Sequence, residues 1–143
     1  GPIAGILFIV GAGGGFKQTL VDSKIADMLA QALVQAALPV LLSAWLVSVA
    51  IRLATGSATV ATITAGGIMA PLAAGLPATH VALMVLSIGA GSVFLSHVND
   101  AGFWLVKEYF GMSVGETFKT WSLMETVLSV TGLAGVMLLS LVV

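Results

Sequence analysis

The feature that most constrains this chain is a run without charged residues, residues 53–99, which ends in the polar segment Ser96-His97-Val98-Asn99-Asp100. Over the whole chain 59% of residues are hydrophobic and 8% are charged, whereas soluble domains carry about 25% charged residues. So few polar groups could not cover a soluble fold. The sequence therefore predicts an all-α integral membrane protein with the lipid bilayer as its main surroundings.

Composition excludes several functions. The net charge of −1 argues against a nucleic-acid partner, and the lack of cysteine excludes disulfides and thiolate metal sites. Because residues 1–143 lack an initiator methionine and enter an apolar stretch at once, we expect them to be one piece of a longer protein.

The first two segments are predicted as scaffold. Residues 1–16 read as the end of a transmembrane helix whose glycines allow close packing. A dinucleotide-binding glycine turn does not fit, because its third glycine would fall on Phe16. Residues 17–35 alternate polar and apolar positions at helical spacing, which predicts an amphipathic helix in the membrane interface.

Residues 36–76 form two short apolar arms around a tip rich in glycine, serine and threonine. Each arm is at the lower limit for a full span, which typically needs about 20 residues. Irregular backbone at membrane depth is tolerated where protein or a water-filled cavity surrounds it. These properties favour a re-entrant hairpin, and two ordinary spans joined by a tight loop stay open as the alternative.

The tip has groups that suit an organic anion. If a helix begins near Ser57, its free N–H groups and positive dipole end face the tip, beside Gly56. Hydroxyls of Thr55, Ser57 and Thr59 can bond ligand hydroxyls, and Arg52 offers a guanidinium for a carboxylate. The alternatives are helix capping for the hydroxyls and a snorkelling surface charge for Arg52.

Residues 81–110 read as a transmembrane helix that is interrupted at Ser96–Asp100. Neither half is long enough to span alone, and discontinuous helices of this kind hold transporter sites near the bilayer midplane. Ser96 and Asn99 are predicted to contact substrate there. The break in the helix therefore predicts a candidate transport site near the bilayer midplane.

Asp100 is the most informative residue of the break, because a carboxylate at membrane depth is costly and functional by default. It could hold a cation, carry a coupled proton or pair with Arg52, and His97 could share the proton. Alternatively, Asn99 and Asp100 only cap the second half-helix. No zinc site and no catalytic residue are predicted, since His97 and Asp100 are two ligands where three or four are usual.

Residues 113–143 are predicted as the final transmembrane helix, opened by a capping box from Ser113 to Glu116. Trp104, Tyr109 and Trp121 are expected to anchor the segment at the interface. Glu125 lies about one turn into the apolar stretch that starts at Trp121, so we expect it to reach the headgroups. The lysines give no orientation by the positive-inside rule.

These motifs together resemble the gluconate permease family, over nearly the whole chain and roughly the C-terminal third of such a permease. The segments that carry the resemblance are residues 11–14, 21–23, 52–61, 89–104, 106–111 and 116–121. The ungapped segment from Ser96 to Trp104 is specific, and Lys24 departs from the glycine expected after Val-Asp-Ser.

The resemblance implies a proton-coupled symporter of the bacterial inner membrane, multi-pass, that imports gluconate or a related sugar acid or hydroxy acid. It also implies half of an inverted-repeat transporter, in which a re-entrant hairpin and a broken helix face each other and the missing N-terminal part supplies the other half. No cofactor is implied beyond the coupling ion, H⁺ or Na⁺. The sequence leaves a homo-oligomer open.

Two other functions stay open. A sodium-coupled organic anion carrier would use Asn99, Asp100 and backbone carbonyls as its cation site. An intramembrane hydrolase would use Ser57 with His97, but these make no triad without a third group and an oxyanion site.

Overall fold

The computed structural model describes residues 22–24, 28, 32 and 38–142. The transmembrane helix end expected at residues 1–16 lies outside the described residues. So does most of the amphipathic helix expected at residues 17–35.

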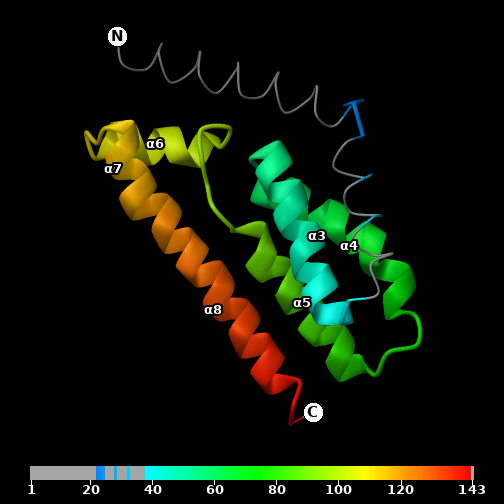
Figure 1. Ribbon diagram of the computed structural model, residues 1–143. Helices are drawn as coiled ribbons and strands as arrows, with labels where there is room; N and C mark the ends of the chain where they lie inside the picture. Colours follow the sequence, from blue (N-terminus) through cyan, green and yellow to red (C-terminus); the bar gives the residue numbers. More distant parts are fainter. Residues whose placement is uncertain (1–21, 25–27, 29–31, 33–37, 143) are drawn as a thin grey trace.

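The secondary structure elements of residues 38–142 are helical, as predicted, and they follow one another with short connections (Figure 1). In chain order they are α3 (Val40–Thr55), α4 (Ala58–Ala73), α5 (Ala78–Ser92), α6 (Ala101–Tyr109), α7 (Val114–Thr117), the π-helix η1 (Phe118–Ser122) and α8 (Leu123–Leu139). Because α7, η1 and α8 adjoin without a gap, they act as one long helix interrupted by a π-turn.

Local signals in the sequence set three of the helix starts. The side chains of Ser57 and Asp100 accept hydrogen bonds from Val60 N and Gly102 N, and so cap α4 and α6. Ser113 and Glu116 form the predicted capping box at the start of α7. Such caps satisfy backbone N–H groups that the first helical turn leaves unpaired.

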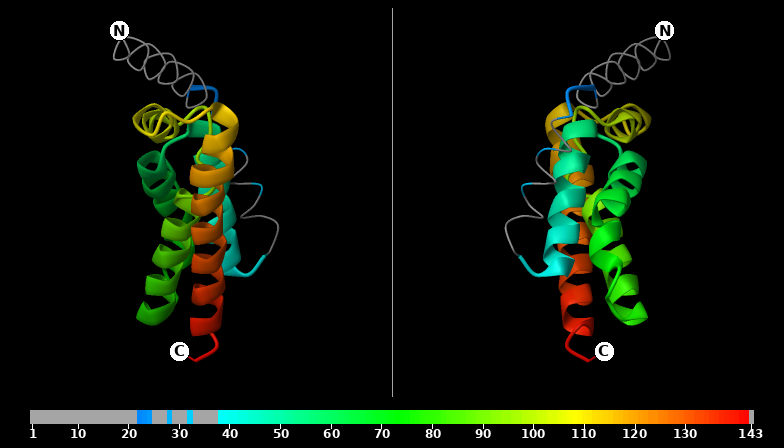
Figure 2. Two further views of the ribbon diagram at one scale, coloured as in Figure 1. Left: turned by 90° about the vertical axis from the view of Figure 1, so that its left-hand side faces the viewer. Right: turned by 90° about the vertical axis from the view of Figure 1, so that its right-hand side faces the viewer.

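Helices α3, α4 and α5 pack side by side, and α8 lies along α5 and α3 (Figure 2). The contact between α3 and α5 is close because small residues line it. Ser48 Oγ donates to the Ile88 carbonyl over 2.8 Å, and Gly91 lies against Trp45 and Ser48. Between these helices lies a buried apolar cluster made of Leu41, Ala44, Val47, Ile51, Ala61, Ala65, Met69, Leu83, Met84, Ile88 and Val136.

Gly91→Ala should loosen the contact between α3 and α5. A Cβ at residue 91 would lie 2.5 Å from the Trp45 carbonyl oxygen and 2.9 Å from Ser48 Cβ. Overpacking of this kind typically costs about 1–3 kcal/mol. Thermal unfolding of the complete protein in detergent should show a lower midpoint than wild type. Gly89→Ala, on the same helix with open space at its Cβ, is the matched control; equal midpoints for both variants would contradict this packing.

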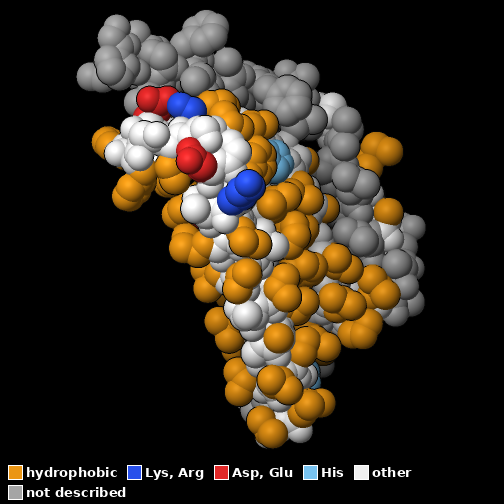
Figure 3. Space-filling model, turned by 60° about the vertical axis from the view of Figure 1, so that its left-hand side comes forward, with side chains coloured by type: hydrophobic (Ala, Val, Ile, Leu, Met, Phe, Trp, Pro, Cys, Tyr) orange, Lys and Arg blue, Asp and Glu red, His pale blue; other side chains and the backbone are white. Residues whose placement is uncertain are grey.

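The outer surface of the bundle is apolar over most of its length. Figure 3 shows hydrophobic side chains over this face, with charged groups gathered toward one end. Large exposed residues on α8 include Leu123, Met124, Val127, Leu128, Val130, Leu138 and Leu139. One described helix, Val114–Leu139, is long and apolar enough to cross a membrane, and three more are apolar but shorter. This surface suits lipid or further apolar protein rather than water.

Candidate functional site

The tip between α3 and α4 touches the break between α5 and α6. Gly56 ends α3 in the left-handed conformation, with φ 64°, and its N–H donates to the Arg52 carbonyl over 2.8 Å. A Cβ on Gly56 would collide with the backbone carbonyl of Asn99. Asn99 Nδ2 in turn donates to the Leu53 carbonyl over 2.8 Å. The two irregular segments that the sequence singles out are therefore in direct contact.

The break extends from the end of α5 at Ser92 to the cap of α6 at Asp100. Leu95 adopts a positive φ of 42° there, which is strained for a bulky residue. Ser96 is fully buried, and its Oγ accepts from Trp121 Nε1 over 2.9 Å while Ser122 Oγ donates to its carbonyl. The π-helix η1 thus holds the break in place, and π-turns are frequent at functional sites.

Arg52, Asp100 and Glu125 form a buried ion cluster next to the contact between tip and break. Arg52 Nη2 is 2.5 Å from Asp100 Oδ2 and 3.4 Å from Glu125 Oε2. The side chains of these residues are 4%, 16% and 14% exposed, respectively. Ser96 Oγ donates to the same Asp100 oxygen over 2.5 Å. One guanidinium is therefore shared between two carboxylates that come from different parts of the chain.

The contacts decide between the readings that the sequence left open for Arg52. A snorkelling surface charge is wrong for this structure, because the last turn of α3 directs the guanidinium inward to Asp100. Asp100 forms the pair with Arg52 and also caps α6, since its Oδ1 accepts from Gly102 N over 2.8 Å. Capping and ion pairing are thus simultaneous rather than alternative.

Two buried polar atoms where the tip meets the break have no hydrogen-bond partner among the described residues. They are Arg52 Nε, a donor, and Asn99 Oδ1, an acceptor. Buried polar groups are nearly always paired, so orphaned ones call for an explanation such as an absent ligand. A carboxylate would satisfy the donor and a hydroxyl would satisfy the acceptor.

The tip hydroxyls and His97 are less clearly aimed at a ligand. Thr55 is buried and its Oγ1 donates to the Ile51 carbonyl over 2.8 Å, while Ser57 Oγ accepts from Val60 N over 3.3 Å. Thr59 is exposed on the first turn of α4. His97 is half-buried, and its Nδ1 accepts from Asn99 N over 3.4 Å. Arg52, Ser96, Asn99 and Asp100 thus lie together where the tip meets the break. The hydroxyls of Thr55 and Ser57 bond nearby backbone groups instead, and Thr59 is exposed.

The sequence model of the GntP family permeases matches residues 1–142. The chain belongs to this family. It is therefore part of a membrane permease rather than an enzyme, as its composition and motifs predict, and the family resemblance noted from the sequence is confirmed.

Relatives of this GntP family chain include named transporters. It is 60% identical over 141 residues to a gluconate permease of Pseudomonas aeruginosa and 52% identical over 141 residues to a high-affinity gluconate transporter of Escherichia coli. It is 49% identical over 144 residues to the L-idonate transporter of the Gnt-II system of E. coli. These matches cover 99% of the chain but 31%, 32% and 32% of the relatives, so the chain spans about a third of their length. No solved structure matches it.

Sequence reasoning missed Glu125 as a member of the ion cluster of this permease chain. We expected it near the headgroups, because it lies about one turn into the apolar stretch that starts at Trp121, but the helix as a whole begins at Val114. Glu125 therefore lies about three turns in, or about 16 Å along the axis. The capping box from Ser113 to Glu116 was the signal for that earlier start. The indole N–H of Trp121, a residue expected at the interface, donates to Ser96 Oγ.

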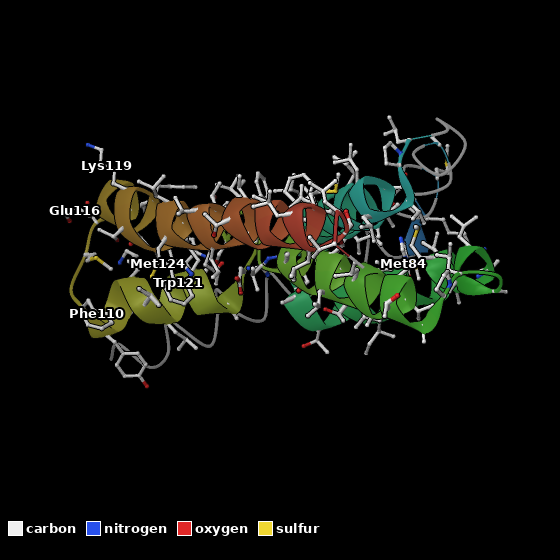
Figure 4. The ribbon with its side chains drawn as sticks, turned by 90° about the horizontal axis from the view of Figure 1, so that it is seen from below. Met84, Phe110, Glu116, Lys119, Trp121 and Met124 are labelled. Carbon is white, nitrogen blue, oxygen red and sulfur yellow. The ribbon has the colours of Figure 1, made fainter. Side chains whose placement is uncertain are left out.

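A cavity of about 290 Å³ lies between α6 and the segment formed by η1 and the start of α8 (Figure 4). It is lined by Val106, Phe110, Met112, Thr120, Trp121 and Met124. The Thr120 hydroxyl already donates to the Glu116 carbonyl over 2.8 Å. A polyhydroxylated anion needs convergent polar groups, so this apolar cavity suits such a ligand less well than the cluster does.

Proposed function

We propose that the complete protein is a secondary transporter that imports gluconate or a related sugar acid or hydroxy acid together with protons across the bacterial inner membrane. Family membership and the names of the relatives support the substrate class. The observation that carries the proposal is the buried Arg52 between tip and break, with one guanidinium N–H unpaired among the described residues.

The hairpin is proposed to be re-entrant. Helices α3 and α4 have 16 residues each, which corresponds to about 24 Å of helix, whereas the hydrocarbon core is about 30 Å thick. The tip at Gly56 would then lie within the membrane, opposite the break of a discontinuous helix. The part of the permease outside this chain would supply the related half of an inverted repeat and the rest of the site.

Within the site, Arg52 binds the substrate carboxylate in a forked contact. Asn99 Oδ1 accepts hydrogen bonds from substrate hydroxyls, and Thr55, Gly56, Ser57 and Thr59 form the tip beside them. A substrate contact by Ser96 stays a prediction, since its Oγ already bonds Asp100 and Trp121. His97 and Asp100 were assigned to the proton from sequence, and this assignment stays a prediction.

Uptake by the complete permease in membrane vesicles tests the function. An imposed pH gradient, acid outside, should drive accumulation of radiolabelled gluconate, and a protonophore should abolish it. Unlabelled L-idonate and other hydroxy acids should compete, whereas unsubstituted fatty acids of similar length should not. Accumulation that follows a sodium gradient and ignores the protonophore would instead support the sodium-coupled carrier and would overturn proton coupling.

A further inference from the structure

The charges of the buried cluster do not balance. Arg52 supplies one positive charge, and Asp100 and Glu125 would supply two negative charges if both were ionised. Among the described residues, Arg52 on α3 and Asp100 at the start of α6 are the charged groups that act on Glu125, and His97 of the break acts on the same pair. An excess negative charge is costly at low dielectric, so one carboxyl favours its neutral form.

The two carboxyl groups are not equivalent. Asp100 accepts from Arg52 Nη2 over 2.5 Å, from Ser96 Oγ over 2.5 Å and from Gly102 N over 2.8 Å, which uses both of its oxygens. Glu125 has a longer contact of 3.4 Å with the same guanidinium nitrogen. Both oxygens of Asp100 are therefore taken up by hydrogen bonds, whereas Glu125 has an oxygen left to accept a proton.

We infer that Glu125, which lies outside the residues predicted from sequence, carries the coupled proton and that its protonation releases Arg52 to bind the substrate carboxylate. This inference rests on the proposed function. Proton and monoanionic substrate together add no net charge, so the net charge of the cluster is the same before and after both enter. When Glu125 returns its proton on the inner side, its carboxylate again competes for Arg52 and expels the substrate.

Asp100 receives a different role in this scheme. It holds Arg52 at the contact between tip and break and caps α6, both of which need a permanent carboxylate or an equivalent acceptor. The role of proton carrier, which the sequence assigned to His97 or Asp100, thus passes to Glu125 on α8. Glu125 and Asp100 can be separated experimentally because they belong to different helices.

Glu125→Gln in the complete permease is the test. The amide keeps the size of the side chain and cannot exchange a proton. We expect loss of gluconate accumulation under a pH gradient, while exchange of internal for external gluconate continues and no longer depends on pH. Glu108→Gln is the matched control, because Glu108 pairs with Lys107 at the exposed end of α6; it should accumulate gluconate as wild type does.

Three results would overturn the inference. Normal proton-driven accumulation by Glu125→Gln would remove the proton from Glu125 while leaving the transporter proposal intact. Loss of both exchange and accumulation, with the protein present in the membrane at the wild-type amount, would make Glu125 a binding or structural residue.

In wild-type protein, a carbodiimide, which modifies protonated buried carboxyls, should label Glu125 more at low pH; labelling of Asp100 instead would also reject the inference. Absence of any proton-linked gluconate uptake in wild type would reject the proposed function itself.

Discussion

Asp100→Asn should abolish uphill gluconate uptake by the complete permease. Asparagine is as good an N-cap as aspartate, so α6 keeps its start and the change removes mainly the charge. Arg52 then pairs with Glu125, the remaining carboxylate within 3.4 Å. Because this pair is neutral, protonation of Glu125 would no longer remove an excess negative charge. Arg52 then stays bound to Glu125 and is not released to bind the substrate. Accumulation of labelled gluconate in vesicles measures the effect.

The amount of protein in the membrane is the control for Asp100→Asn. Breaking a buried ion pair usually costs about 3–5 kcal/mol because a charge is left unpaired, but Glu125 can take over here, so the protein should still fold. The double variant Arg52→Gln with Asp100→Asn removes both charges and should also lack uptake. Wild-type accumulation by Asp100→Asn would exclude a role for this carboxylate in coupling.

Gly56→Ala should also eliminate transport, for a steric reason. The φ of 64° at Gly56 is left-handed, and this conformation costs a residue with a Cβ roughly 1–2 kcal/mol. The added methyl group would also collide with the Asn99 carbonyl and approach Asn99 Oδ1 to 2.6 Å. The backbone at both places must move, so tip and break would separate. Gluconate binding and uptake by the complete permease should both be lost.

Gly66→Ala is the matched control for this change. Residue 66 lies on α4, in the same hairpin, and a Cβ there would meet no atom within 4 Å. It should behave as wild type or be slightly more stable, since alanine favours a helix over glycine. If Gly56→Ala transports as well as Gly66→Ala, the contact between tip and break is not needed for function.

Local hydrogen bonding explains which parts of the fold could be predicted. The caps at Ser57 and Asp100 and the capping box from Ser113 to Glu116 join residues two or three positions apart. Their geometry follows from the residue types alone, and the sequence therefore located these helix starts. The membrane environment also followed directly, from the scarcity of charged residues.

By contrast, only some of the contacts within the site could be predicted from the sequence. It named Arg52 and Asp100 and listed their pairing among three roles, because two opposite charges in an apolar chain attract each other wherever the fold allows. It did not predict that Glu125 contacts Arg52 or that Trp121 bonds Ser96, since the direction of a helical side chain depends on how the helix is rotated and packed. The π-turn at Phe118–Ser122 changes that rotation without a clear sequence signal.

Composition and local caps thus determined that this chain is helical, apolar on the outside and interrupted at Gly56-Ser57 and around Ser96–Asp100. The tertiary structure decided that these interruptions touch each other and that Arg52 meets carboxylates 48 and 73 positions away. The reason is physical: a cap is closed by neighbours along the chain, whereas a shared guanidinium requires three helices to be packed in register.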